Sequence, residues 1–133
     1  MYRVEKEVYM FKFKTKPFKH QETVFNESKE LESFAILWEQ GCGKSKITID
    51  TIAHLFYEKK INGLLVVAPS GVDLNWITDE LPRHLQDDIS LGMHTHHYKS
   101  SKAATKWHEK AVREVTNHDP DRLAVLAMSY DAF

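Results

Sequence analysis

The sequence predicts an α/β domain in which helices cover both faces of a parallel β-sheet. Three continuous apolar runs, at residues 34–38, 64–68 and 123–129, have the composition of strands buried on both faces. Between these runs, apolar residues recur at three- and four-residue spacing, which is typical of helices with one buried side. Strands that alternate with helices favour a parallel sheet joined by right-handed crossovers. In such sheets, ligands bind beyond the carboxyl ends of the strands.

The N-terminal residues predict an arm followed by a helix. In residues 8–14 the aromatic side chains of Tyr9, Phe11 and Phe13 share one face at a period of two, so residues 1–16 are expected to form an arm with a short strand. Pro17 fits the first turn of a helix. One side of that helix carries Phe18, Gln21, Phe25 and Ser28.

Three more helices follow from the same spacing. The first opens near Lys44 and ends before the Asn62-Gly63 turn, the second ends near Pro82, and the third covers residues 103–115. Residues 89–98 form an ambiguous strand. The expected buried stripes are Ile49, Ile52, Ala53 and Phe56, then Leu74, Ile77 and Leu81, then Ala104, Trp107, Ala111 and Val115.

The composition is that of a globular domain. The chain has 133 residues, of which 42% are hydrophobic and 28% charged, so intrinsic disorder is not expected. No apolar run approaches the roughly 20 residues of a membrane span, and no apolar block resembles a signal peptide. A single cysteine, Cys42, excludes an internal disulfide. We therefore expect a cytoplasmic protein without a membrane partner, in a bacterial, phage-infected or nuclear setting.

A glycine turn, Gly41-Cys42-Gly43-Lys44-Ser45, carries the most specific chemistry. Glycines allow backbone N–H groups to turn inward around phosphate oxygens, and the following helix adds the positive end of its dipole. Lys44 is placed to reach the β- and γ-phosphates, and the Ser45 hydroxyl to bind Mg²⁺. The general phosphate-loop pattern has a further glycine where this chain has Trp38. We predict a site for ATP with Mg²⁺, in which Lys44 and Ser45 act on the phosphates.

The stretch from Trp38 to Ser45 resembles motif I of superfamily-two helicases and translocases, most closely the Swi/Snf branch and related phage helicases. Pro17-Phe18-Lys19-His20-Gln21 is similar to the adenine-reading glutamine motif of that family, about twenty residues before the loop. The resemblance implies a RecA-like nucleotide-binding fold. It also implies a set of nucleotide-binding residues: Gln21, Glu39, Gln40, Gly41, Cys42, Gly43, Lys44, Ser45 and Lys46.

Two later stretches are similar to the nucleic-acid motifs of the same family. Residues 66–70 with residues 74–81 resemble motif Ia, and residues 127–131 resemble motif Ib. In the family these loops touch the nucleic-acid backbone, which implies phosphate contacts from Pro69, Ser70, Asn75 and Ser129 and a nucleic-acid partner, preferably DNA. The aromatic side chain of Trp76 is expected to pack in the fold instead.

Charge and histidine content add two weaker signals. Residues 1–20 hold six basic against two acidic side chains, and residues 99–113 hold five against one, so either patch could face phosphates or be solvated surface. Six histidines fall between residues 84 and 118, but no cysteine accompanies them, and neighbouring residues of a strand point to opposite faces. We therefore expect packed or solvated histidines and no zinc site.

The family's Asp-Glu-x-His motif, which holds Mg²⁺ and positions the attacking water, does not occur in this sequence. We expect the chain to be a truncated part of the first motor domain, or less favourably one half of a split gene, and not to hydrolyse ATP by itself. A full-length parent would be an ATPase. Two alternatives stay open: a P-loop kinase or nucleotidase, and a non-catalytic nucleotide- or DNA-binding module. The adenine-type glutamine and the segment 69–79 favour the motor over the kinase.

Overall fold

A computed structural model describes residues 11–39, 41–99, 106–117 and 119–132 of the chain. Three parallel strands form one open sheet, β1(Gly63–Ala68), β2(His94–Tyr98) and β3(Ala124–Ser129), in the order β1-β3-β2. The register pairs Ala68 with Ser129 and His96 with Leu126. Two of the expected strands, at residues 64–68 and 123–129, are therefore confirmed, and the sheet is parallel as predicted.

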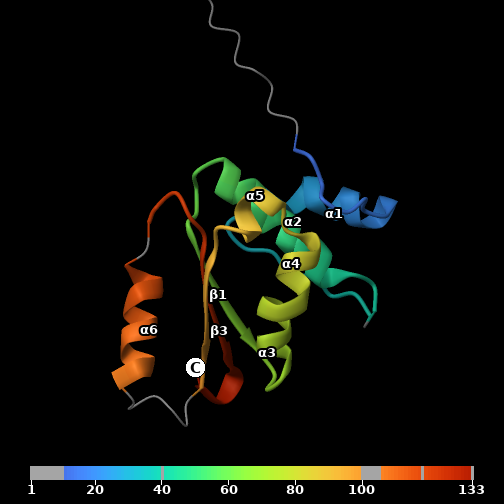
Figure 1. Ribbon diagram of the computed structural model, residues 1–133. Helices are drawn as coiled ribbons and strands as arrows, with labels where there is room; N and C mark the ends of the chain where they lie inside the picture. The colour runs from blue at the N-terminus through green and yellow to red at the C-terminus, as the bar shows by residue number, and fades with distance from the viewer. Residues whose placement is uncertain (1–10, 40, 100–105, 118, 133) are drawn as a thin grey trace, which may run out of the picture.

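Helices cover both faces of the sheet, as expected. Helix α6(Lys106–Thr116) packs on one face against β2 and β3, while α2(Lys44–Tyr57), α3(Val72–Asn75) and α4(Leu81–His84) lie on the other (Figure 1). The short helix α1(Lys19–Ser28) packs against α2, and α5(Asp87–Ser90) follows α4. No helix in these described ranges is long and apolar enough to cross a membrane.

The hydrophobic core lies between α2 and the sheet. Its members come from the predicted stripe of α2, from β1, from the central strand β3 and the residue before it, and from α5, with two leucines that follow the π-helical turn η1(Trp76–Glu80). Ile49 and Ala53 are fully buried, and Phe56 packs at the edge of the cluster, so this predicted stripe is confirmed. The buried set is Ile49, Ile52, Ala53, Val66, Ala68, Leu81, Leu85, Ile89, Leu123, Val125 and Ala127.

The strand expected at residues 34–38 does not form, and this prediction was wrong. The segment has no regular secondary structure, and Leu37 and Phe34 are 92% and 48% exposed. An apolar run becomes a strand only when a neighbouring strand pairs with its backbone groups. Among the described residues, β1 and β2 are the outer strands of the sheet, and neither pairs with this segment.

The helical segment after β1, which was expected to end near Pro82, ends two residues later, at His84. Residues Val72–Asn75 are α-helical, the next five form η1, and Leu81–His84 are α-helical again. The Leu81 N–H bonds to Trp76 O, five residues back. Such a wider turn changes the hydrogen-bond ladder around a proline, which has no N–H to donate. Trp76 packs against the core, as predicted.

The described part of the N-terminal arm, from Phe11 onward, packs through its aromatic side chains and contains no strand. The rings of Phe11 and Phe13 each lie 5.1 Å from that of Phe25 on α1, while Tyr9 falls outside the described residues. Phe18, predicted on the same side of α1 as Phe25, is 71% exposed. The ambiguous segment 89–98 divides into the end of α5 and strand β2. Helix α6 confirms the helix expected over 103–115, with Val115 buried and Ala104 outside the described residues.

Candidate functional site

The turn at residues 41–43 leads directly into the first turn of α2. Gly41 and Gly43 have φ angles of 83° and 81°, which L-residues with a side chain adopt only with strain. Gly43 is the N-cap of α2, and no side chain caps this helix start. The first backbone N–H groups of α2 thus lack a capping side chain and are oriented as an anion would require. Cys42 and Glu39 are exposed, and Gln40 lies outside the described residues.

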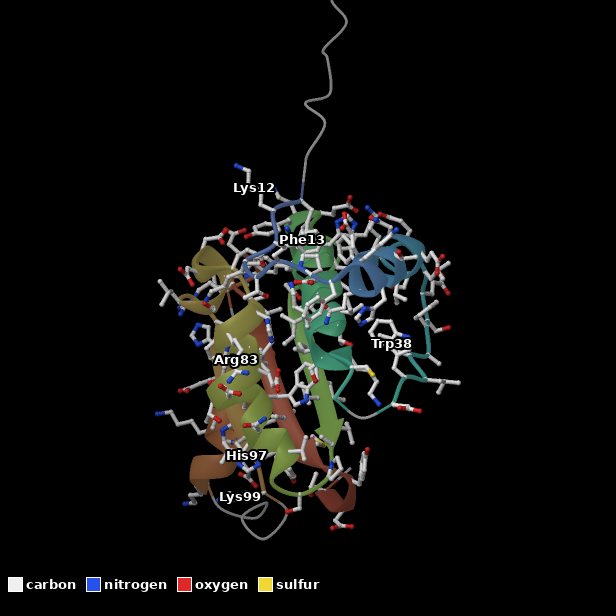
Figure 2. All side chains as sticks on the ribbon, turned by 90° about the vertical axis from the view of Figure 1, so that its right-hand side faces the viewer. Lys12, Phe13, Trp38, Arg83, His97 and Lys99 are labelled. Carbon is white, nitrogen blue, oxygen red and sulfur yellow. The ribbon has the colours of Figure 1, made fainter. Side chains whose placement is uncertain are left out.

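Lys44 and Ser45 stand at the first turn of this helix, as the loop hypothesis requires. The Lys44 side chain is exposed and its Nζ donates to Trp38 O at 2.9 Å, which closes the loop on itself. Ser45 is half-buried in the same turn. Figure 2 shows Trp38 beside α1 and the start of α2. A bound phosphate would offer Lys44 a charged partner in place of this neutral carbonyl, and charge-assisted hydrogen bonds are the stronger kind.

Gln21 reaches the loop, but the protein already uses its amide. Its Oε1 accepts the N–H of Phe18 at 2.8 Å, and its Nε2 donates to Gly43 O at 3.3 Å. The side chain is only 5% exposed. The structure therefore brings Gln21, the predicted adenine-reading residue, next to the turn at residues 41–43, where its buried amide bonds to the backbone on both sides.

An exposed aromatic surface lies between α1 and the loop. The Phe18 and His20 rings are stacked at 6.0 Å, and the Trp38 ring lies 5.0 Å from His20. His20 Nε2 is also 3.3 Å from Cys42 O. Because aromatic faces stack on nucleic-acid bases, this surface is chemically suited to stacking with a base beside the turn at residues 41–43. The sequence reasoning did not single it out.

The Lys46 side chain, expected among the nucleotide contacts, points into the protein instead. Its Nζ lies 2.6 Å from Asp50 Oδ2 and 5.0 Å from the centre of the Phe13 ring, and it is 5% exposed. Burial raises the pKa of Asp50 to about 6, although the hydrogen bond from Lys46 acts in the other direction. Only the backbone N–H of Lys46 is left to face a phosphate, since the ammonium group is committed to a buried ion pair.

A second site lies where the three strands end. A hollow of about 300 Å³ is lined by residues that follow β1, by the end of β2 and by the end of β3. It brings together Ser70 and Ser129, two of the residues expected to touch nucleic acid. Pro69 and Asn75 are exposed nearby in the chain but do not line it. The lining residues are Ser70, Gly71, Asp73, His97, Tyr98, Lys99, Ser129 and Asp131.

The sequence did not point to a close contact in this hollow between a buried carboxylate and a half-buried histidine. Asp73 is 2% exposed, and its Oδ2 lies 2.6 Å from His97 Nε2, while its Oδ1 accepts the Gly71 N–H at 2.9 Å. Burial by itself would raise the pKa of Asp73, but hydrogen bonds from His97, Leu74 and Gly71 outweigh it and lower that pKa. The useful signal in the sequence was position, because His97 and Lys99 sit at a strand end where ligands bind in parallel sheets.

Two other polar clusters are closed by their own partners. Glu30, His54 and Glu58 could supply three metal-binding atoms within 4.8 Å of one another. The Lys60 Nζ lies 2.9 Å from a carboxylate oxygen of each glutamate. The ammonium group of Lys60 therefore already balances the charge of these carboxylates. A hollow of about 580 Å³ lies at the amino-terminal ends of β1 and β3, and there the Tyr57 hydroxyl donates to Asp88 at 2.6 Å.

Comparisons with known proteins found no matching family model, no similar curated protein and no similar solved structure.

Proposed function

We propose that this chain binds ATP with Mg²⁺ through the loop at residues 41–45 and serves as the ATP-binding part of an ATP-dependent nucleic-acid motor, acting on DNA. The observation that carries the proposal is the uncapped start of α2 behind two left-handed glycines, with the ammonium group of Lys44 beside it. This arrangement offers backbone donors, a helix dipole and an exposed ammonium group to one triphosphate. The support rests on the loop and α2, because the strand expected before them is not part of the sheet.

In this proposal Lys44 meets the β- and γ-phosphates and Ser45 binds the Mg²⁺ that the nucleotide brings. Lys44 exchanges its neutral partner, Trp38 O, for charged oxygens. A charge-assisted hydrogen bond contributes about 1.5–3 kcal/mol, which corresponds to a tenfold or greater change in affinity. The nucleic acid would lie at the strand ends, where Ser70 and Ser129 line one hollow. Their hydroxyl groups would donate to phosphate oxygens of its backbone.

Calorimetric titration of the chain with Mg·ATP tests the nucleotide half of the proposal. We expect Lys44→Ala to weaken binding about tenfold or more. Lys106→Ala is the matched control, because Lys106 is an exposed lysine of α6 on the other face of the sheet, and it should bind as the parent does. Equal ATP affinity in the parent and in Lys44→Ala would reject the loop as the phosphate site.

Base preference tests the region between α1 and the loop. An amide offers a donor and an acceptor together, which matches the adenine edge, whereas guanine presents two acceptors there. Gln21→Ala should therefore reduce the preference for ATP over GTP more than it reduces triphosphate affinity. Phe18→Ala should weaken both nucleotides alike, because stacking on an exposed ring does not depend on the base edge. A parent chain that binds ATP and GTP equally in competition would remove the adenine role.

A further inference from the structure

The hollow at the strand ends contains a histidine whose ring is fixed by a buried carboxylate. His97 Nε2 lies 2.6 Å from Asp73 Oδ2, and Asp73 is 2% exposed and also bound to the Gly71 N–H. Both carboxylate oxygens of Asp73 are thus engaged within the protein, so this carboxylate is not available to a ligand. Its function in the hollow is to orient the imidazole, because the contact from Asp73 Oδ2 to Nε2 fixes which way the ring faces.

The tautomer of His97 decides what the ring can offer to a ligand. With Nε2–H donating to the carboxylate, a neutral ring leaves Nδ1 as an acceptor, which repels an anionic oxygen. Protonation converts Nδ1 into a second donor. Within the described part of the chain, Nδ1 has no hydrogen-bond partner, and the ring lines the hollow. An anion can therefore be bound by this ring only when His97 is charged.

The other groups around the hollow set its charge. Lys99 is an exposed basic side chain, and Figure 2 shows it close to His97 at the end of the sheet. Asp131 is exposed and negative, while Ser70 and Ser129 supply neutral hydroxyl donors and Tyr98 lines the wall. Helix α6, which carries further charged residues, packs on the opposite face of β2 and β3. With neutral His97 the two acids outnumber Lys99, and with charged His97 the hollow is electrically balanced.

We propose that His97, oriented by Asp73, is a proton-dependent contact for a backbone phosphate of a nucleic-acid strand in this hollow, alongside Lys99, Ser70 and Ser129. The inference rests on the nucleic-acid half of the proposed function. It adds to that half a binding residue, His97, and a dependence on pH. His97 is the phosphate-binding group, and Asp73 is a positioning residue. Binding strengthens as pH falls because the donor that meets the phosphate appears only on protonation.

Fluorescence anisotropy of the whole chain with a labelled oligonucleotide, at constant salt, tests this inference. The parent should bind about tenfold more tightly at pH 5.5 than at pH 8, since one charge-assisted hydrogen bond is gained. His97→Gln keeps a polar side chain but cannot gain charge, so most of this difference should disappear. His94→Gln is the matched control, because His94 is at the start of the same strand and does not line the hollow. It should keep the full pH difference.

Two further variants separate positioning from charge. Asp73→Asn should reduce the pH difference while circular dichroism shows the fold intact, and Asp131→Asn should strengthen binding at both pH values by removing an opposing charge. A pH difference in His97→Gln equal to that of the parent would overturn the inference alone. Inorganic phosphate and unlabelled oligonucleotide should also be compared as competitors at equal concentrations of phosphate groups. If they displace the labelled oligonucleotide equally well, the hollow is a site for free phosphate. Absence of oligonucleotide binding at every pH would reject the nucleic-acid half of the proposed function as well.

Discussion

The side-chain amide of Gln21 occupies the space that a side chain on Gly43 would need. A Cβ at Gly43 would lie 2.1 Å from Gln21 Nε2, and that nitrogen donates to Gly43 O at 3.3 Å. Gln21 also holds the first turn of α1 through Phe18 N–H. This one glutamine therefore ties the start of α1 to the start of α2, across 22 residues of sequence.

Gly43→Ala should destabilise the chain more than Gly41→Ala. Both positions have a left-handed φ, which costs a residue with a side chain about 1–2 kcal/mol. Only at Gly43 does the new methyl group also displace the Gln21 amide, because nothing lies within 4 Å of a Cβ at Gly41. Urea unfolding should show a further loss of roughly 1 kcal/mol at Gly43, the cost of one hydrogen bond. Adding Gln21→Ala to both glycine variants should make their free energies of unfolding alike, and a persistent gap would contradict the steric explanation.

Lys46→Met should be strongly destabilising, whereas Lys46→Met with Asp50→Leu should not. The ammonium and carboxylate are 5% and 0% exposed, and Asp50 Oδ1 is a buried oxygen without a hydrogen-bond partner. Removing one member leaves the other buried and unpaired, at a cost of about 3–5 kcal/mol, while apolar replacement of both is often neutral or stabilising. Chemical denaturation measures all three proteins. Lys110→Met, which removes an exposed ion pair with Glu114, should change stability by less than about 1 kcal/mol.

Lowering the pH should raise the free energy of unfolding of the parent chain relative to that of Asp50→Asn, which has no carboxyl group at this position. Burial raises the Asp50 pKa from 3.8 to about 6, so between these values the folded chain holds the proton more tightly than the unfolded chain. The free energy of unfolding therefore falls as pH rises from about 4 to 6, by at most roughly 3 kcal/mol. The stability of the parent minus that of Asp50→Asn should be more favourable at pH 4 than at pH 7. A difference that is the same at both pH values would show that folding does not raise the pKa of Asp50.

Cys42 gives a direct report on nucleotide in the loop. It is exposed, free and the single cysteine of the chain, so a maleimide label reads one position. Mg·ATP should slow its labelling, because the phosphates would lie against the Gly41–Gly43 turn. Lys44→Ala should lose this protection at the same ATP concentration. Labelling that is equally fast with and without saturating ATP would place the nucleotide elsewhere.

The sequence by itself determined the elements whose signal is local. The stripe of α2 and the apolar runs of β1 and β3 all appear where the spacing predicted them, since periodicity acts within a few residues. The loop before α2 was identifiable for the same reason. Its use as an ATP site remains a prediction, because composition and spacing report the donors but not the ligand.

Only the tertiary structure decided which of these groups meet. Residues 34–38 have the composition of a strand but no strand beside them in the described sheet, and pairing, not composition, makes a strand. Lys46 was predicted at the phosphates and instead pairs with Asp50 one helical turn away, because its position on α2 faces Phe13 and the interior. Asp73 and His97 are 24 residues apart, and the parallel ends of β1 and β2 bring them within 2.6 Å. Such contacts depend on the order of the strands and on which side of each helix faces the sheet. Both are set by contacts between residues that are far apart in the chain.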